Sequence, residues 1–252
     1  MTTDARLAAR LADEAGRLLL RLRGASGSRT TDEARELGRR GDAEANALIL
    51  RGLAGERPGD AVLSEESADD PVRLSAGRVW IVDPLDGTRE YGIGRPDWTV
   101  HVALWKAGEG ITDAAVAEPD RGRVIATDEK SEKTVEKPGK AVRILVSGTR
   151  PPEFAQKVAD DVGGELVPMG SAGAKAMAVV RGEADAYLHA GGQYEWDSAA
   201  PVGVARSAGL HASRIDGSEL VYNRPSPYLP DLLICRSALA DPLLRAIVRA
   251  RN

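Results

Sequence analysis

The chain has 252 residues, of which 42% are hydrophobic and 29% charged, with a formal net charge of −4 and a pI of about 5.6. This length and composition are typical of a soluble globular protein with one large domain or two closely joined lobes. The mild acidity argues against a surface that coats nucleic acid, and the only cysteine, Cys235, excludes an intramolecular disulfide and a Cys-based zinc site.

Two helices are expected at the N-terminal end. Apolar residues at three- and four-residue spacing between Leu7 and Leu22 indicate an amphipathic helix that ends at Gly24. A second helical pattern runs from about Asp42 to Leu53, and Asp42 is well placed to be its N-cap.

A block of strands follows, and after it strands and helices alternate. The block has expected strands at 61–63, 79–82, 99–105, 114–117 and 123–127. The second of these should end at Asp83-Pro84, because proline cannot continue a central strand. The charged segment 128–140 is expected to be a surface loop. Beyond it, strands are expected at 142–146, 166–167, 184–188 and 232–234, and helices at 152–161, 171–181, 196–208 and 238–250.

This order of elements predicts an α+β fold with a layered arrangement. We expect a mostly antiparallel sheet in an N-terminal lobe, residues 1–140, and an α/β C-terminal lobe, residues 141–252. The first residues lack the apolar core of a signal peptide, and no apolar run is long enough to span a membrane. We therefore expect a cytoplasmic protein without a membrane or nucleic-acid partner.

Three acidic groups follow expected strands or begin an expected helix: Glu65-Glu66, the run 83–88 (Asp-Pro-Leu-Asp-Gly-Thr) and Asp197. Carboxylates at such positions can converge at one edge of a sheet, where a divalent cation relieves their mutual repulsion. Oxygen ligands without Cys or His favour Mg²⁺ over the alternatives Mn²⁺ and Ca²⁺. Each group alone has a simpler explanation, as a solvated loop, a turn or a helix N-cap, so the prediction depends on all of them together.

The run 83–88 also indicates a phosphate site. Gly87 permits an unusual backbone angle or a close ligand approach, and a helix that starts near Thr88 would present free N–H groups to an anion. Metal and phosphate would then lie side by side, which is the arrangement that metal-assisted phosphoryl hydrolysis requires.

Together these motifs resemble the Mg²⁺-dependent, lithium-sensitive phosphatases of the inositol monophosphatase superfamily. Residues 80–88 resemble the first family signature, residues 196–201 followed by Ala208-Gly209 resemble the second, and Glu65-Glu66-Ser67 matches a third element, all in the family order. The resemblance implies a layered αβαβα sandwich, and a homodimer.

Three segments resemble the CysQ-type bisphosphate nucleotidases of this superfamily: 88–91 (Thr-Arg-Glu-Tyr), 97–100 (Asp-Trp-Thr-Val) and 195–197 (Glu-Trp-Asp). They imply hydrolysis of 3'-phosphoadenosine 5'-phosphate to AMP and phosphate, a step in sulfate assimilation. Inositol 1-phosphate and fructose 1,6-bisphosphate are alternative substrates for the same site. A catalytically silent protein that binds phosphorylated ligands is a third alternative, and it would require a broken metal set.

The resemblance also implies a role for each matching residue. One Mg²⁺ would be held by Glu65, Asp83 and the Leu85 carbonyl, a second by Asp83, Asp86 and Asp197, and a weaker third would be reached by Glu65. Thr88 would orient the attacking water with Asp42 as its partner, so Asp42, Thr88 and Glu65 form the implied catalytic set. The implied substrate contacts are Gly87, Thr88, Ser147, Ser171, Ala172, Glu195 and Asp197.

The segment from Arg29 to Arg40, just before Asp42, departs from the family pattern. Two interpretations are open for it. It is either a solvated loop or a segment that supplies arginines to a substrate phosphate.

Overall fold

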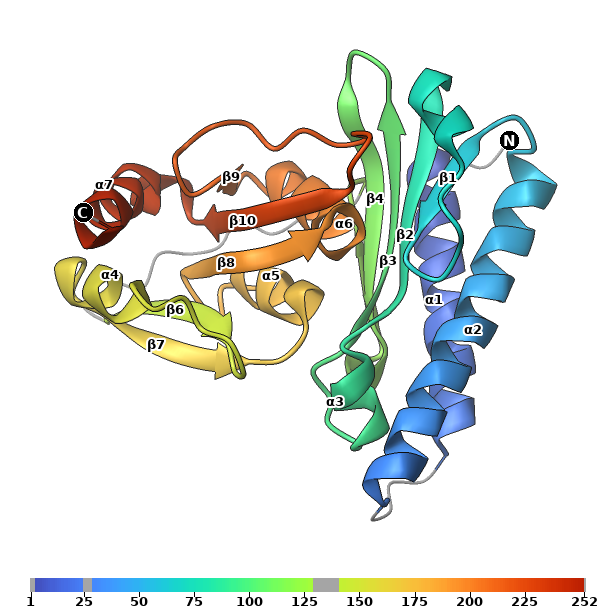
Figure 1. The fold of residues 1–252 in the computed structure, drawn as a ribbon, viewed down its shortest axis with the longest axis horizontal. Helices are drawn as coiled ribbons and strands as arrows, with labels where there is room; N and C mark the ends of the chain where they lie inside the picture. Colours follow the sequence, from blue (N-terminus) through green and yellow to red (C-terminus); the bar gives the residue numbers. More distant parts are fainter. Residues whose placement is uncertain (1–2, 25–28, 129–140, 252) are drawn as a thin grey trace.

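A computed structural model describes residues 3–24, 29–128 and 141–251, which form five layers of alternating helices and sheets (Figure 1). The first layer holds two long helices, α1 (Asp4–Arg23) and α2 (Thr31–Glu56). They cover a sheet of five strands in the order β1 (Ala61–Ser64), β2 (Arg78–Asp86), β3 (Thr99–Lys106), β4 (Gly110–Glu118) and β5 (Arg123–Ala126).

The middle layer consists of α5 (Ala172–Val180) and α6 (Glu195–Ser207). Beyond it lies a second sheet in the order β7 (Gly164–Met169), β6 (Val142–Ser147), β8 (Ala186–Tyr194), β10 (Tyr228–Cys235) and β9 (His211–Ser213). The outer layer holds α4 (Ala155–Asp161) and α7 (Ala240–Arg251). The predicted αβαβα sandwich is therefore confirmed. Short helical segments connect the layers: α3 (Thr88–Gly92) and the 3₁₀ turns Pro71–Ser75, Pro119–Arg121 and Ser237–Leu239.

The strand directions agree with the predicted arrangement. In the first sheet only β1 and β2 are parallel, and the other neighbouring pairs are antiparallel. In the second sheet β6 is parallel to β7 and β8, whereas β10 is antiparallel to β8 and β9. Strand β9 and the turn at 71–75 were not predicted. The expected loop at 128–140, with the lobe boundary in it, lies outside the described residues except for Asp128, so the division into lobes stays a prediction.

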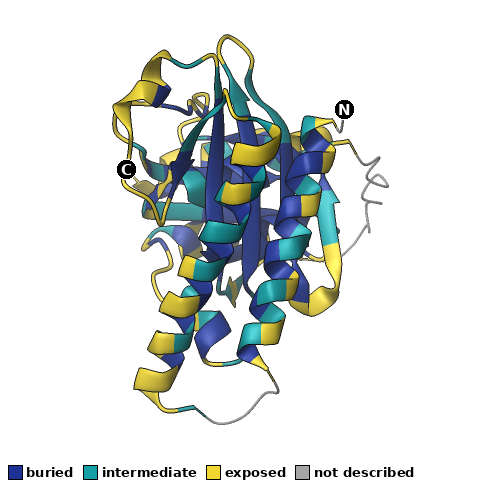
Figure 2. Cartoon of the chain, turned by 90° about the vertical axis from the view of Figure 1, so that its right-hand side faces the viewer, coloured by how far each residue is buried: buried dark blue, intermediate teal, exposed yellow. Residues whose placement is uncertain are grey.

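Helix α1 forms as the periodicity predicts. Thr3 caps its start by accepting a hydrogen bond from the Arg6 amide, and Gly24 follows its last turn with φ 62°. Its apolar face packs with α2 against the first sheet, and Figure 2 shows the two helices with buried inner faces and exposed outer faces. No helix among residues 3–24, 29–128 and 141–251 is long and apolar enough to cross a membrane.

Helix α2 corrects two predictions. It begins at Thr31 rather than near Asp42, with a capping box between Thr30 and Glu33, so Asp42 lies inside the helix and is not its N-cap. The segment from 29 to 40 is mostly helical and is not a loop. Its exposed arginines pair with acids one turn away on the same helix: Arg35 with Asp32, Arg39 with Glu36, and Arg40 with Glu44.

Strand β2 also runs further than predicted. It passes through Pro84 to Asp86, because a shift in its pairing with β3 absorbs the proline. Asp83 pairs with His101 and Asp86 pairs with Thr99, so the two residues between the acids lie in an irregular stretch of the ladder. This irregularity places both acids at the same end of the sheet.

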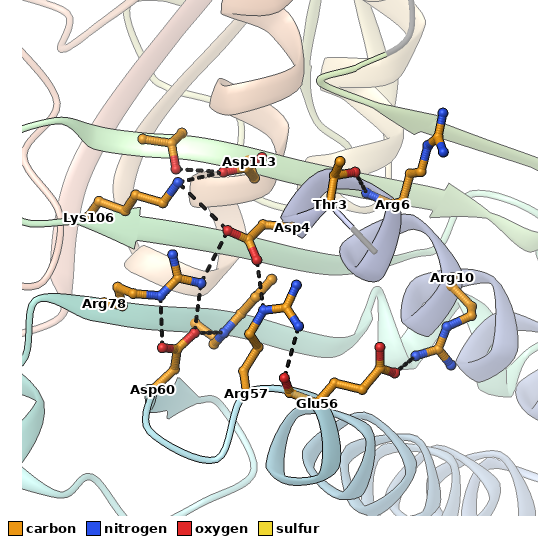
Figure 3. A network of polar contacts seen from close by, with 12 residues as sticks. Thr3, Asp4, Arg6, Arg10, Glu56, Arg57, Asp60, Arg78, Lys106 and Asp113 are labelled. Carbon is orange, nitrogen blue, oxygen red and sulfur yellow. Dashed lines mark hydrogen bonds and ion pairs between the residues drawn. The ribbon is translucent and has the colours of Figure 1, made fainter. Parts of the chain in front are cut away.

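The opposite end of β2 lies in a network of ion pairs (Figure 3). Arg78 donates to Asp60 at 2.8 and 2.9 Å and to Asp4 at 3.1 Å. Arg57 donates to Asp4 at 2.9 Å, and Lys106 lies 3.7 Å from Asp4. Because these residues come from α1, the end of α2 and two strands, the network fastens the helical layer to the sheet.

Candidate active site

Three carboxylates converge where β2 ends. One oxygen from each of Asp83, Asp86 and Asp197 lies within 4.8 Å of the other two, in a group that could hold a metal ion. Asp83 is fully buried and accepts a hydrogen bond from the Leu85 amide at 3.1 Å, which fixes the turn between the two β2 acids. The sequence therefore placed these three acids correctly in one group.

Helix α6 brings Asp197 to the group from the second half of the chain. Asp197 is the third residue of this helix, and it accepts a hydrogen bond from the Tyr194 amide at 2.6 Å. The preceding carbonyl, of Trp196, lies 3.0 Å from His101 Nδ1 on β3. His101 thus connects the start of α6 to the first sheet, beside the acids.

Helix α5 holds Asp86 in place from the same layer. The Asp86 carboxylate accepts hydrogen bonds from the Ser171 hydroxyl at 2.7 Å, the Gly173 amide at 2.6 Å and the Ala172 amide at 3.2 Å. The free amides at the N-terminus of a helix favour a negative charge there. Gly173 is required for this contact, because a Cβ atom would lie 2.1 Å from His101.

Asp42 approaches the group from α2. A Cβ atom on Gly38 would lie 2.6 Å from Thr88, so glycine at this position lets α2 pack against the start of α3. Thr88 donates to the Leu85 carbonyl at 3.1 Å. One Asp42 oxygen is buried and has no hydrogen-bond partner among the described residues. Sequence and structure therefore agree that Asp42 and Thr88 are neighbours, although the prediction placed Asp42 at a helix start.

Glu65 closes the group from the end of β1. Its amide donates to the Val82 carbonyl at 3.2 Å, which holds it beside β2. The residue keeps a solvent-accessible surface, although the surrounding chain desolvates its carboxyl group. Asn46, one turn after Asp42 on α2, steadies the following turn by donating to the Ser67 hydroxyl at 3.1 Å. Sequence reasoning missed Asn46, although its four-residue spacing from Asp42 was a usable signal.

Burial and neighbouring negative charges raise the pKa values of Asp42, Glu65, Asp83 and Asp197. Burial, followed by the negative charges of Glu65, Asp86 and Asp197, raises the pKa of Asp83 well above its usual range. Desolvation and nearby acids raise the pKa of Asp42 to about 8, and a hydrogen bond with Thr88 acts in the opposite direction. The same causes raise the pKa of Glu65 and of Asp197 to about 7.

The donor set fits a divalent cation. It offers carboxylate oxygens from several elements, and no Arg or Lys among the described residues forms an ion pair with any of the five acids. A cation of charge two would remove the repulsion and meet the oxygen-ligand preference of Mg²⁺. The partnerless oxygen of Asp42 is a second sign that the site is built for groups that the chain does not supply.

A cavity of about 710 Å³ opens beside the acids. Its lining includes the acids Glu65, Asp86, Glu90 and Asp197 and four Arg or Lys residues, Arg89, Arg95, Arg150 and Lys175. Among the described residues, no carboxylate pairs with Arg89 or Arg150. Lys175 donates to the carbonyls of Gly170 and Ser171, and burial lowers the pKa of its ammonium to about 8. The cavity therefore brings basic side chains into the same space as acids that could hold a metal ion.

The predicted substrate contacts fall into two groups. Gly87, Thr88, Ser147, Ser171, Ala172 and Asp197 line the cavity. Glu195 does not line it: its side chain is buried and accepts hydrogen bonds from the amides of Asn223 at 2.7 Å and Arg224 at 2.9 Å. Its position indicates that it anchors a loop. Asp42, Asp83 and Leu85 are not among the residues that line the cavity.

Several residues that line the cavity were not predicted, and Lys175 is one of them. Lys175 is the single charged residue inside the alanine-rich helix α5, and a lysine in an otherwise apolar helix was a signal that could have been used. Gln193, at the end of β8 in the segment just before the second signature, also lines the cavity.

Comparisons with known sequences agree with the geometry. The chain matches the inositol monophosphatase family over residues 2–250. The 3'-phosphoadenosine 5'-phosphate phosphatase of Mycobacterium leprae is 55% identical, covering 98% of this chain and 94% of its own length. The protein of the same name from Mycobacterium tuberculosis is 56% identical over 94% of this chain and 90% of its own length. The 3'(2'),5'-bisphosphate nucleotidase CysQ of Escherichia coli is 32% identical over 75% of this chain and 80% of its own.

Solved structures give the same fold. CysQ from Bacteroides thetaiotaomicron superimposes with a TM-score of 0.78 at 24% identity, covering 93% of this chain and 97% of its own. An inositol monophosphatase from Zymomonas mobilis has a TM-score of 0.78 at 22% identity, with 97% of each chain covered. At such identities the likeness concerns the fold alone.

Proposed function

The chain belongs to the inositol monophosphatase family, and from this premise we propose that it is a Mg²⁺-dependent phosphatase that hydrolyses 3'-phosphoadenosine 5'-phosphate to AMP and phosphate. The observation that carries the proposal is the meeting of Asp83, Asp86 and Asp197 beside a cavity that Arg89, Arg150 and Lys175 also line. Two relatives named for this activity, each more than half identical over nearly the whole chain, support the choice of substrate.

The basic residues of the cavity support a substrate with two phosphates. The acids and their cation would take the phosphate that is cleaved. Arg89 and Arg150, which have no carboxylate partner among the described residues, suit the second phosphate, because a guanidinium binds phosphate oxygens in pairs. An inositol monophosphate has no second phosphate to occupy them.

Two or three Mg²⁺ ions would be held by Glu65, Asp83, Asp86, Asp197 and the Leu85 carbonyl. The chemistry that Mg²⁺ supplies when bound is neutralisation of phosphoryl charge and activation of water. The chain's own groups would orient the reactants. Thr88 would direct the attacking water, and the Asp42 carboxylate beside it would accept a proton from the Thr88 hydroxyl or the water.

The rest of the site would position the substrate. The amides of Gly87 and Thr88 would donate to the phosphate that is cleaved, and Ser147, Ser171 and Ala172 line the space for the nucleotide. We further propose that the enzyme acts in sulfate assimilation in the cytoplasm as a lithium-sensitive homodimer. These properties rest on the family resemblance, and the single buried cysteine is compatible with a reducing compartment.

The test is phosphate release with Mg²⁺ from three substrates. We expect kcat/KM for 3'-phosphoadenosine 5'-phosphate to exceed that for inositol 1-phosphate and fructose 1,6-bisphosphate by roughly a hundredfold or more, which is about 2.7 kcal/mol of transition-state discrimination. Comparable values, or a preference for the inositol or sugar phosphate, would overturn the substrate and keep the phosphatase. No phosphate release from any of the three would favour the alternative hypothesis of a catalytically silent protein that binds phosphorylated ligands.

A further inference from the structure

Gln193 has an amide group that the protein leaves without a partner. It is the penultimate residue of β8, its side chain lines the cavity, and only 6% of the residue is exposed. Both Nε2 and Oε1 are buried, and neither has a hydrogen-bond partner among the described residues. Buried polar atoms are nearly always paired, so a side chain with both a donor and an acceptor left open indicates a bound group that completes it.

The backbone fixes where this amide lies. Gln193 pairs with Leu229 on β10, and a shift in register follows within two residues. Gly191 and Gly192 precede it with φ values of 124° and 91°, a conformation that favours glycine. A Cβ atom on Gly192 would lie 2.6 Å from the Tyr228 hydroxyl. Glycine at these positions therefore allows the strand to turn close to Tyr228 and to bring Gln193 to the cavity wall.

An aromatic surface lies next to the amide. The rings of Tyr194 and Trp196 stack with their centroids 4.9 Å apart and their planes 12° from parallel, and both residues line the cavity. Tyr194 remains 47% exposed. A flat, partly open aromatic ring beside a paired donor and acceptor suits a planar heterocycle, which can stack on the ring and hydrogen bond at its edge.

We propose that Gln193 recognises the base of the nucleotide substrate through two hydrogen bonds to its edge. In adenine the Gln193 carbonyl would accept from the 6-amino group, while its NH₂ would donate to an adjacent ring nitrogen, the pairing that glutamine makes with adenine. Inositol and sugar phosphates have no such planar edge. The inference rests on the proposed function and adds the residue that gives base specificity.

The test combines one variant with one altered substrate. Gln193→Met keeps the length of the side chain and removes both polar atoms. The altered substrate has purine in place of adenine, so it lacks the 6-amino group. We expect the wild type to prefer the adenine substrate over the purine analogue by roughly tenfold to a hundredfold in kcat/KM, and the variant to lose this preference. Activity on inositol 1-phosphate should change less than twofold.

Gln156 provides the matched control, because it is the only other glutamine of the chain and lies on the exposed face of α4. Gln156→Met should keep the preference for adenine. The melting temperature of Gln193→Met should equal or exceed that of the wild type, since an unpaired buried amide is replaced by an apolar group.

The outcomes separate the two proposals. If Gln193→Met keeps the adenine preference, or loses activity equally on all substrates, the inference is wrong while the proposed function stands. A lower melting temperature with an unchanged adenine preference would assign the amide to a structural role through buried water and would also overturn it. A wild type that does not prefer the adenine nucleotide over inositol 1-phosphate contradicts the proposed function itself, and the inference with it.

Discussion

Strand β2 begins at Arg78 in a network of paired charges and ends at Asp86 among acids that have no Arg or Lys partner in the described part of the chain. In the network, burial alone would raise the pKa of Asp4, but hydrogen bonds from Arg57 and Arg78 outweigh it and lower the pKa below its usual value. At the other end, burial and repulsion raise the pKa of Asp83 well above its usual value.

The difference between the two ends of β2 separates charges that stabilise the fold from charges that could bind a ligand. A carboxylate whose pKa is lowered on folding stabilises the folded protein, and one whose pKa is raised opposes folding when it is ionised. The network therefore acts as a structural clamp. The acids at the end of β2 repel one another in the metal-free protein, and a bound cation would offset that repulsion.

The largest expected effect is on turnover when the acidic end loses a charge. Asp83→Asn keeps the volume and the oxygen that accepts the Leu85 amide, so the fold should persist. We expect kcat to fall on the order of 10²–10³-fold or more, while the metal-free variant unfolds at the same or a higher temperature than the wild type. Phosphate release and calorimetry measure the two quantities. Near-normal turnover would contradict the claim that the acids at the end of β2 hold a metal that the reaction needs.

The second expected effect is a pH dependence of the metal-free protein. In the folded protein the pKa of Asp42 is about 8 and those of Glu65 and Asp197 are about 7, all above the ordinary values near 4. These groups therefore contribute stability that is fully present below about pH 4 and is lost as the pH rises through 7 and 8.

Asp4 acts with the opposite sign, because its folded pKa is lowered. Its contribution is present above its ordinary pKa of 3.8 and is lost on acidification below it. Melting temperatures in excess chelator should therefore fall between pH 5 and 8, and added Mg²⁺ should reverse the fall. A melting temperature that rises over this interval without metal would be incompatible with the assignment.

A third, smaller effect is expected at the paired end. Asp60 accepts two hydrogen bonds from Arg78 and one from the Trp80 indole at 2.8 Å. Asp60→Asn should lower the free energy of unfolding by about 1–3 kcal/mol and should leave kcat within twofold. Chemical denaturation and initial rates test both parts. A large loss of turnover here would mean that the two ends of β2 are not independent.

The smallest effect is expected on the outer face of α2. Arg39 and Arg40 form exposed pairs with Glu36 and Glu44 and do not line the cavity. The double variant Arg39→Gln, Arg40→Gln should change stability by less than about 1 kcal/mol and kcat/KM by less than twofold. A tenfold rise in KM for the bisphosphate substrate would revive the interpretation that these arginines bind phosphate.

Much of this site could be predicted because its ligands lie in contiguous motifs. Asp83 and Asp86 follow an apolar run, and Asp197 begins a helical pattern, so local rules placed them at element ends. Asp42 was harder, since Arg39-Arg40-Gly41 reads as an interruption. In the fold Gly41 is needed for close packing, because a Cβ atom there would lie 3.0–3.1 Å from Leu19, Leu85 and Tyr91. The close tertiary contacts, and not helix propensity, explain why position 41 is a glycine.

The remaining differences have a similar origin. Glu195 stands beside two site residues in the sequence, but the first turn of α6 directs it to the amides of Asn223 and Arg224. Gln193 acquires its importance only from what surrounds it, an absence of partners and a neighbouring pair of stacked rings. Neither property can be read from a sequence without the pairing of β8 with β10.

The most direct test of the central claim is a calorimetric titration of Mg²⁺ into chelator-treated wild type, Asp83→Asn and Asp60→Asn at one pH. The account predicts saturable binding to the wild type, equal binding to Asp60→Asn, and binding to Asp83→Asn that is weakened at least tenfold. Equal binding to all three proteins, or no binding to the wild type, would contradict the claim that the unpaired acids at the end of β2 form the metal site.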